Sequence, residues 1–133
     1  MISNEVRYML IGGIAVGYYG YLRTTGDIDL WVDNSSENGE AVAAVLTAFG
    51  ISLSEDFTNT FQEAGKVFRM GCPPMRIEII TGISGVKFND CYPRRKRVEF
   101  DDIDIDIIDL EDLKVNKKAS GRTNDIDDLA HLP

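Results

Sequence analysis

The fold is decided by the segments Leu10-Ile11-Gly12-Gly13-Ile14-Ala15-Val16 and Gly26-Asp27-Ile28-Asp29-Leu30. Residues 6–11 form a short apolar run that ends at a glycine pair, which predicts a buried strand followed by a tight turn. The apolar positions of residues 14–22 have helical spacing. Residues 27–32 alternate between polar and apolar before they become continuously apolar, which predicts a second, central strand.

Asp27 and Asp29 lie two positions apart in this predicted strand, so their carboxylates point to the same face. Neighbouring carboxylates repel each other unless a cation lies between them, and Mg²⁺ prefers carboxylates together with the phosphate oxygens of a substrate. Gly12 and Gly13 open the predicted helix, where backbone N–H groups can receive a phosphate. The pattern indicates a nucleoside triphosphate site; a solvated strand face and an ordinary turn are the alternatives.

Glu78 lies in Arg76-Ile77-Glu78-Ile79-Ile80, a predicted strand whose other residues are mainly apolar. From the spacing alone, an exposed position on the strand is the simpler interpretation. If this strand lies beside residues 27–32, Glu78 instead completes an acidic triad suited to two-metal phosphoryl transfer.

The remaining pattern interleaves helices and strands. Helices are predicted at residues 39–49, 110–120 and 124–132, and strands at residues 67–70, 75–80 and 103–107. The strands at 67–70 and 75–80 form a hairpin, and the alternating Ile and Asp residues of 103–107 are typical of a half-exposed strand. One antiparallel hairpin among interleaved elements predicts an α/β fold with a mixed sheet flanked by helices.

The composition limits the size and the partners of the protein. With 133 residues, the chain has room for one domain, residues 1–133. The 14 Lys and Arg against 22 Asp and Glu give a net charge of -8, which argues against a broad nucleic-acid-binding face and against a polybasic membrane patch. No apolar run approaches the roughly 20 residues of a membrane helix, and a signal-peptide pattern is missing, so we expect a cytoplasmic protein.

The cysteines and the histidine argue against two further classes of chemistry. Cys72 and Cys91 form no Cys-x-x-Cys pair, and His131 lies almost at the C-terminus. A zinc site of Cys and His therefore lacks ligands, and a Ser–His or Cys–His hydrolase would depend on this terminal histidine.

Several segments together resemble the polymerase-beta-like nucleotidyltransferases. The two quoted segments resemble the signature of this superfamily, and Ile77–Phe88 is similar to its third-carboxylate strand and the turn beyond. Residues 109–129, with Lys117 and Asp125, are similar to its C-terminal helical signature. Within the superfamily, the chain is most similar to the small bacterial branch related to abortive-infection and toxin–antitoxin nucleotidyltransferases.

The resemblance implies a nucleotidyltransferase fold and roles for particular residues. Gly12 and Gly13 would form the phosphate-binding turn. Asp27 and Asp29 would be the metal ligands, and Glu78 would take the place of the third acid, as general base or further ligand.

Three more polar residues have two interpretations each. The resemblance implies that Lys117 contacts a phosphate and that Asp125 orients Lys117 by charge pairing. The alternative is that both residues only tie the last two helices together. Arg23, just before the acidic pair, could hold a phosphate or form a salt bridge with Asp27.

The function implied by the resemblance is Mg²⁺-dependent transfer of a nucleoside monophosphate from a nucleoside triphosphate, such as ATP, to an acceptor. The acceptor could be tRNA, a protein side chain or a small molecule. The basic run Arg94–Arg97 is a solvated loop or contacts a polyanionic acceptor.

Two alternatives belong to other functional classes. The first is a catalytically silent nucleotide-binding module or toxin–antitoxin component. The second is a purely structural subunit, which predicts that Glu78 lies far from the two aspartates. For the helices that often flank this domain in relatives, we expect either a minimal version of the fold or a partner chain that supplies them.

Overall fold

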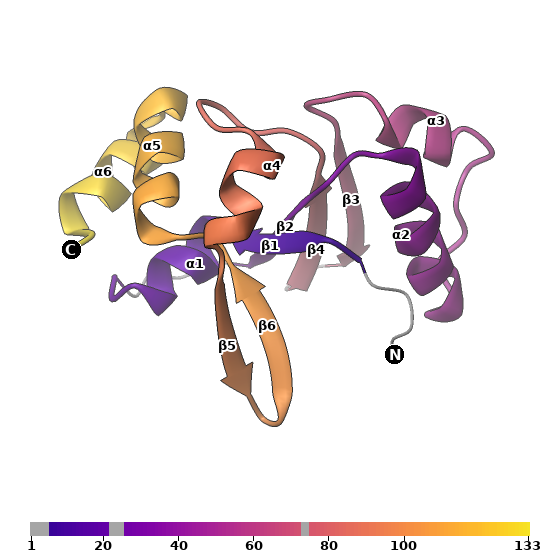
Figure 1. Cartoon of the computed structure of the whole chain (residues 1–133), viewed down its shortest axis with the longest axis horizontal. Coiled ribbons are helices and arrows are strands. Elements are labelled where there is room, and N and C mark those ends of the chain that lie inside the picture. Colours follow the sequence, from indigo (N-terminus) through magenta and orange to yellow (C-terminus); the bar gives the residue numbers. More distant parts are fainter. Residues whose placement is uncertain (1–5, 22–25, 73–74) are drawn as a thin grey trace.

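The protein forms a mixed six-stranded sheet with helices at both ends (Figure 1). The structure is a computed structural model and describes residues 6–21, 26–72 and 75–133. The order of the described strands across the sheet is β3-β4-β2-β1-β6-β5. Their bounds are β1 Tyr8–Ile11, β2 Asp27–Val32, β3 Val67–Cys72, β4 Met75–Ile80, β5 Lys96–Phe100 and β6 Ile103–Ile107.

Strand pairing is parallel at two positions and antiparallel at three. Strand β2 runs parallel to β4, and β1 runs parallel to β6. Strand β1 is antiparallel to β2, and β3–β4 and β5–β6 are antiparallel hairpins. This arrangement confirms the predicted α/β fold class with a mixed sheet, and it confirms the predicted β3–β4 hairpin.

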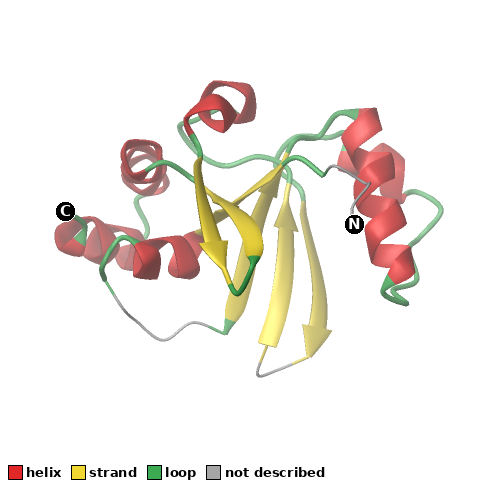
Figure 2. Cartoon of the chain, turned by 60° about the horizontal axis from the view of Figure 1, so that its bottom comes forward, coloured by secondary structure: helices red, strands yellow, loops and turns green. Residues whose placement is uncertain are grey.

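Apart from α4, the described helices fall into two groups (Figure 1). Helices α2 and α3 lie beyond one end of the sheet, and α1, α5 and α6 lie beyond the other, as the view in Figure 2 also shows. The helices are α1 Gly12–Tyr18, α2 Ser36–Ala48, α3 Phe57–Phe61, α4 Phe88–Cys91, α5 Leu110–Ser120 and α6 Thr123–His131, and a 3-10 turn covers Tyr92–Arg94.

The apolar core consists of two clusters of buried side chains. In one cluster, Met9 and Trp31 pack with Leu113 of α5, and the Trp31 ring contacts Phe88 of α4 edge to face. In the other, Val32 of β2 packs with residues of α2 and α3. Because Trp31 and Val32 are consecutive in a strand, the two clusters lie on opposite faces of the sheet.

Local signals predict several elements closely. The structure places β2 and α5 at the predicted residues. Ser35 caps α2 by accepting a hydrogen bond from the Asn38 N–H at 3.2 Å, as expected for serine before a helix. Helix α1 begins at Gly12, earlier than predicted, and ends at Tyr18.

The basic run Arg94–Arg97 is not the solvated loop that we considered. Arg94 ends the 3-10 turn, and Lys96 begins β5, a strand that the sequence analysis does not predict. Arg94 forms an ion pair with Asp112, and Arg95 and Arg97 form ion pairs with Asp106. The buried carboxylates of Asp112 and Asp106 thus hold these arginine side chains against the protein surface.

The half-exposed pattern predicted for residues 103–107 is wrong in detail. Ile103, at the tip of the β5–β6 hairpin, is 64% exposed, whereas Asp106, near its base, is 4% exposed. The tip projects from the body of the molecule (Figure 1), so exposure changes along the hairpin rather than from one residue to the next.

Among the described residues, no helix is both long enough and apolar enough to cross a lipid bilayer.

Candidate active site

Asp29 lies in a row of paired residues that crosses four strands. Its register partners are Ile11 of β1 on one side and Glu78 of β4 on the other, and Glu78 is in turn paired with Arg69 of β3. The Asp29 and Glu78 carboxyl groups share a hydrogen bond. The structure therefore places Glu78 directly beside Asp29, which the purely structural alternative does not predict.

Asp27 extends the acidic cluster along the same face of β2. It is paired in register with Arg76 of β4, and the Arg76 Nε lies 3.3 Å from the Asp27 Oδ1. Because residues two apart in a strand share a face, Asp27 and Asp29 present their carboxyl groups on the same side of the sheet. The three predicted acids therefore lie on neighbouring strands at the junction of β2 and β4.

The pKa values of Asp29 and Glu78 are shifted in opposite directions. Burial, the hydrogen bond with Glu78 and the negative charges of Glu78 and Asp27 raise the pKa of Asp29 to about 6. The hydrogen bond from Arg69 is the main cause that lowers the pKa of Glu78. Of the two groups, Asp29 therefore holds a proton up to about pH 6, whereas Glu78 is ionised well below that pH.

Gly12 brings the chain very close to Asp29. Its φ of +68° lies in the left-handed region that favours glycine. A Cβ atom at this position would lie 2.2 Å from the Asp29 Oδ2, a distance too short for two non-bonded atoms. The turn between β1 and α1 can approach the acidic pair only because residue 12 has no side chain. Gly13, the next residue, is buried in the first turn of α1.

The donor set suits a hard divalent cation such as Mg²⁺. Carboxylate oxygens are its preferred protein ligands, and the buried Asp29 Oδ1 has no hydrogen-bond partner among the described residues. In the described part of the chain, no three His, Cys, Asp or Glu side chains converge closely enough to hold a metal ion in this arrangement. Arg69 and Arg76 instead engage Glu78 and Asp27.

Lys117 and Asp125 lie in a buried ion cluster between α5 and α6. The Lys117 Nζ lies 3.0 Å from the Asp125 Oδ1 and 3.1 Å from the Asp128 Oδ2, and all three side chains are at most 5% exposed. Burial alone would raise the pKa of Asp125. Hydrogen bonds from Arg122, Ser120 and Lys117 outweigh burial and hold this pKa well below its usual range. The pairing of Lys117 with Asp125 agrees with both interpretations of these residues, and the contact with Asp128 joins α5 to α6.

The same cluster also influences the acidic site. The charge of Lys117 opposes the upward shift of the Asp29 pKa. Arg122 donates from its Nε to Asp125 at 2.8 Å, and Asp29 and Glu78 contribute to the raised pKa of Arg122. The junction of α5 and α6 therefore places two cations within electrostatic range of the acids.

Sequence reasoning missed Arg69 and Arg76 as residues of this site. The signal for Arg76 was available, since it lies two positions before Glu78 in the same strand and so on the same face. Arg69 follows only from the register of the β3–β4 hairpin. Arg23, the other predicted phosphate contact, lies outside the described residues.

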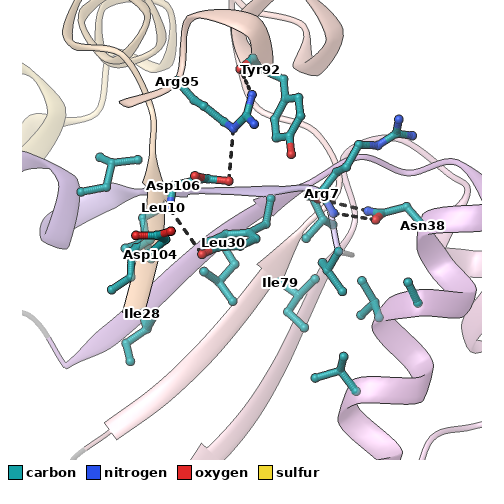
Figure 3. A pocket seen from close by; sticks show the side chains of 18 of the residues that line it. Arg7, Leu10, Ile28, Leu30, Asn38, Ile79, Tyr92, Arg95, Asp104 and Asp106 are labelled. Atoms are coloured by element: carbon teal, nitrogen blue, oxygen red, sulfur yellow. Dashed lines mark hydrogen bonds and ion pairs between the residues drawn. The ribbon is translucent and has the colours of Figure 1, made fainter. Parts of the chain in front are cut away.

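A large pocket lies on the other face of the sheet (Figure 3). Its volume is about 1620 Å³, and its lining includes Leu10, Ile28, Leu30 and Ile79. None of the three acids lines it. Ile28 and Leu30 alternate with Asp27 and Asp29 along β2, so the cavity and the acidic cluster are separated by the sheet.

Comparison with known protein families gives one match. The model of the family described as nucleotidyl transferase of unknown function (DUF2204) matches residues 1–133. A search of curated proteins finds no match to the chain.

Proposed function

Since the chain belongs to this family of nucleotidyl transferases, we propose that it moves a nucleoside monophosphate from a nucleoside triphosphate to an acceptor hydroxyl, with Mg²⁺ as cofactor. The observation that carries the proposal is the pairing of Asp29 with Glu78 on neighbouring strands. Asp27 on the same face and the side-chain-free turn at Gly12 support it.

Asp27 and Asp29 are the residues that would hold the cation, with Glu78 as a further ligand or as the base. When bound there, Mg²⁺ would supply the neutralisation of negative charge on the phosphate oxygens during in-line displacement. Asp29 must lose its proton to become a ligand, because a metal ligand has to be deprotonated. The charge of Lys117 favours that loss.

The turn at Gly12 and Gly13 provides the side of the site that receives the donor. Without a side chain at residue 12, the backbone N–H groups of this turn can approach phosphates held beside Asp29. The leaving pyrophosphate would therefore lie on the β1 side of Asp29.

Glu78 is suited to accept the proton of the acceptor hydroxyl. Its lowered pKa keeps it ionised, and it lies on the β4 side of Asp29. In the transfer, the acceptor oxygen forms a bond to the α-phosphorus while the bond to pyrophosphate breaks. The hydroxyl proton passes to the Glu78 carboxylate.

Transfer from radiolabelled nucleoside triphosphates tests the proposal. Incubation of the protein with each triphosphate, labelled at the α-phosphate, and a whole-cell lysate should label the acceptor. Asp27→Asn and Asp29→Asn should each lower the labelling rate by more than about 100-fold, since each removes a proposed metal ligand. Asp104→Asn removes an exposed strand aspartate elsewhere and should leave the rate unchanged. Full labelling by either site variant would contradict the assignment.

The finer resemblance, to the abortive-infection and toxin–antitoxin branch, stays a prediction, as does the alternative of a silent module. Calorimetry with Mg²⁺ and each nucleoside triphosphate separates the functional classes. Binding without pyrophosphate release from any acceptor favours the silent module, and absence of binding leaves only an interaction protein.

A further inference from the structure

The row of residues through Asp29 gives the proposed site two chemically different sides. Gly12 and the β1–α1 turn lie on the β1 side, and Glu78 and Arg69 lie in order on the β4–β3 side. In an in-line displacement, the attacking and leaving oxygens are on opposite sides of the phosphorus. With pyrophosphate leaving toward Gly12, the acceptor hydroxyl must approach from the side of Glu78 and Arg69.

The acceptor side of the proposed site carries two exposed arginines, although the chain as a whole is acidic. Arg69 and Arg76 have side chains 64% and 48% exposed. Glu78 is the only acidic residue in the sequence of β3 and β4, while the whole chain has a net charge of -8. An anion that approaches the acids from this side therefore meets guanidinium groups first.

The contact between Arg69 and Glu78 leaves part of the guanidinium available. Arg69 donates from its Nε to the Glu78 Oε2 at 2.7 Å, and Glu78 is its one hydrogen-bond partner among the described residues. Neither Nη group of Arg69 makes a hydrogen bond within the described part of the chain, and an arginine fork can donate two parallel hydrogen bonds to a phosphate.

In the basic run Arg94–Arg97, two arginines use both Nε and Nη2 for carboxylates. Arg94 makes two hydrogen bonds to Asp112, from Nε at 3.0 Å and from Nη2 at 2.9 Å. Arg97 likewise uses Nε and Nη2 for Asp106. The three arginines of the run Arg94–Arg97, which sequence reasoning offered as a contact for a polyanionic acceptor, are thus engaged by carboxylates of their own chain.

We propose that Arg69 binds a phosphate group of the acceptor, so that the hydroxyl that receives the nucleotide belongs to a phosphate-bearing molecule. This inference rests on the proposed function. Arg69 acts in the site as a binding residue for the acceptor, and its Nε bond to Glu78 positions the base beside the hydroxyl.

Acceptor binding is tested on the full chain by fluorescence anisotropy. The protein is saturated with Mg²⁺ and an α,β-methylene nucleoside triphosphate, in which the bond broken in transfer cannot be cleaved. One arm titrates a labelled single-stranded RNA of about ten nucleotides with a free 3′ hydroxyl, within the usual size of single-strand sites. The second arm competes with ribose 5-phosphate, and unphosphorylated ribose is its control.

Arg69→Gln should weaken binding of the phosphate-bearing probe about tenfold or more, the usual effect of losing a charged hydrogen bond. Arg69→Lys keeps the charge without the fork and should lose less. Arg97→Gln, another exposed and ion-paired strand arginine, should stay within about twofold of wild type, as expected for a residue remote from the acids. Competition by ribose 5-phosphate points to a small phosphorylated acceptor, and binding of RNA alone points to a polynucleotide end.

The outcomes separate this inference from the function on which it rests. If the wild-type protein binds no triphosphate analogue with Mg²⁺, the proposed function fails and the inference fails with it. If the analogue binds but neither probe does, or if Arg69→Gln binds the probe as wild type does, the inference is overturned while the proposed function stands. Arg69→Gln should bind the analogue as tightly as the wild type does, because Arg69 is proposed to contact the acceptor and not the triphosphate.

Discussion

At the scale of single residues, the contact between Gly12 and Asp29 explains why a glycine pair and an acidic pair occur together in this chain. The left-handed backbone at Gly12 and the 2.2 Å that would separate a Cβ atom from the Asp29 Oδ2 are two separate reasons for glycine. The positive φ favours glycine whatever surrounds residue 12. The close approach favours glycine because the Asp29 carboxyl group occupies the space of a side chain. Matched substitutions can distinguish the two.

Gly12→Ala should damage both stability and the site. A left-handed conformation costs an alanine about 1–2 kcal/mol of unfolding free energy, and the clash adds to this cost. Displacement of Asp29 should lower the transfer rate by about 100-fold, as misplaced catalytic groups do. Urea unfolding and the labelling assay measure the two effects.

Gly50→Ala is the control for Gly12→Ala. Gly50 has a φ of +84°, and a Cβ atom there would have nothing within 4 Å. This variant should lose about 1–2 kcal/mol of unfolding free energy and keep its transfer activity. Equal activity of both variants would show that the contact with Asp29 has no role.

The Asp29 carboxyl group should make the stability of the metal-free protein depend on pH. Its pKa of about 6 lies above the ordinary value of 3.8, so the folded protein binds this proton more tightly than the unfolded chain. The resulting stabilisation is complete below about pH 4 and is lost as the pH rises through about 6. Glu78, with its lowered pKa, has the opposite effect, in the acidic range below 4.5.

In EDTA, the melting temperature of the wild-type protein should therefore contain a component that falls between about pH 5 and pH 7. Asp29→Asn cannot ionise and should lack this component, so it should melt above the wild type at the upper end of the range. Asp104→Asn should follow the wild type. Thermal melts by circular dichroism measure this, and parallel curves for wild type and Asp29→Asn would refute the assignment of the raised pKa.

At the scale of secondary-structure elements, the buried charges between α5 and α6 hold the C-terminal helices in place beside the acids. Lys117 of α5 contacts Asp125 and Asp128 of α6, and the Tyr21 ring, which follows α1, stacks on His131 with ring centroids 3.9 Å apart. Helix α6 is thus joined to two elements. The phosphate-binding role of Lys117 stays a prediction, since its pairing with Asp125 is expected for both roles.

Lys117→Ala should destabilise the protein strongly. It leaves two buried carboxylates without their shared cation, and breaking a buried ion pair from one side costs about 3–5 kcal/mol. Lys118→Ala, at the exposed neighbouring position, should change the unfolding free energy by less than about 0.5 kcal/mol. Urea unfolding of both variants measures the difference, and similar values would contradict a structural role for Lys117.

At the scale of the whole molecule, the proposed metal site joins segments that are distant in the sequence. Asp27 and Asp29 belong to β2 and Glu78 to β4, so a bound cation would connect the N-terminal part of the sheet to the β3–β4 hairpin. A ligand that binds only the folded state stabilises that state.

Mg²⁺ at about 100 times its dissociation constant should add roughly 2.7 kcal/mol to the unfolding free energy and raise the melting temperature by roughly 10 °C for a chain of this size. EDTA should reverse the shift. The double variant Asp27→Asn with Asp29→Asn should show no Mg²⁺-dependent shift. An equal shift in both proteins would place the cation elsewhere, and no shift in the wild type would argue against a metal site in the absence of nucleotide.

Elements that depend on short-range signals can be predicted from the amino-acid sequence alone. The alternation of Asp27 to Val32 and the serine cap of α2 are local, and both appear in the structure where the pattern predicts them. The shared face of Asp27 and Asp29 follows from the strand period alone. These features need no knowledge of distant residues.

Contacts between distant residues, in contrast, depend on how the whole chain folds. Glu78 lies 49 positions after Asp29, and no local pattern states that β4 pairs with β2 in the register that joins them. The same holds for Arg69 beside Glu78 and for the capture of Arg97 by Asp106. Strand order and register arise from burial of apolar faces across the whole sheet, so the acids are predicted one by one, whereas the site exists only in the folded chain.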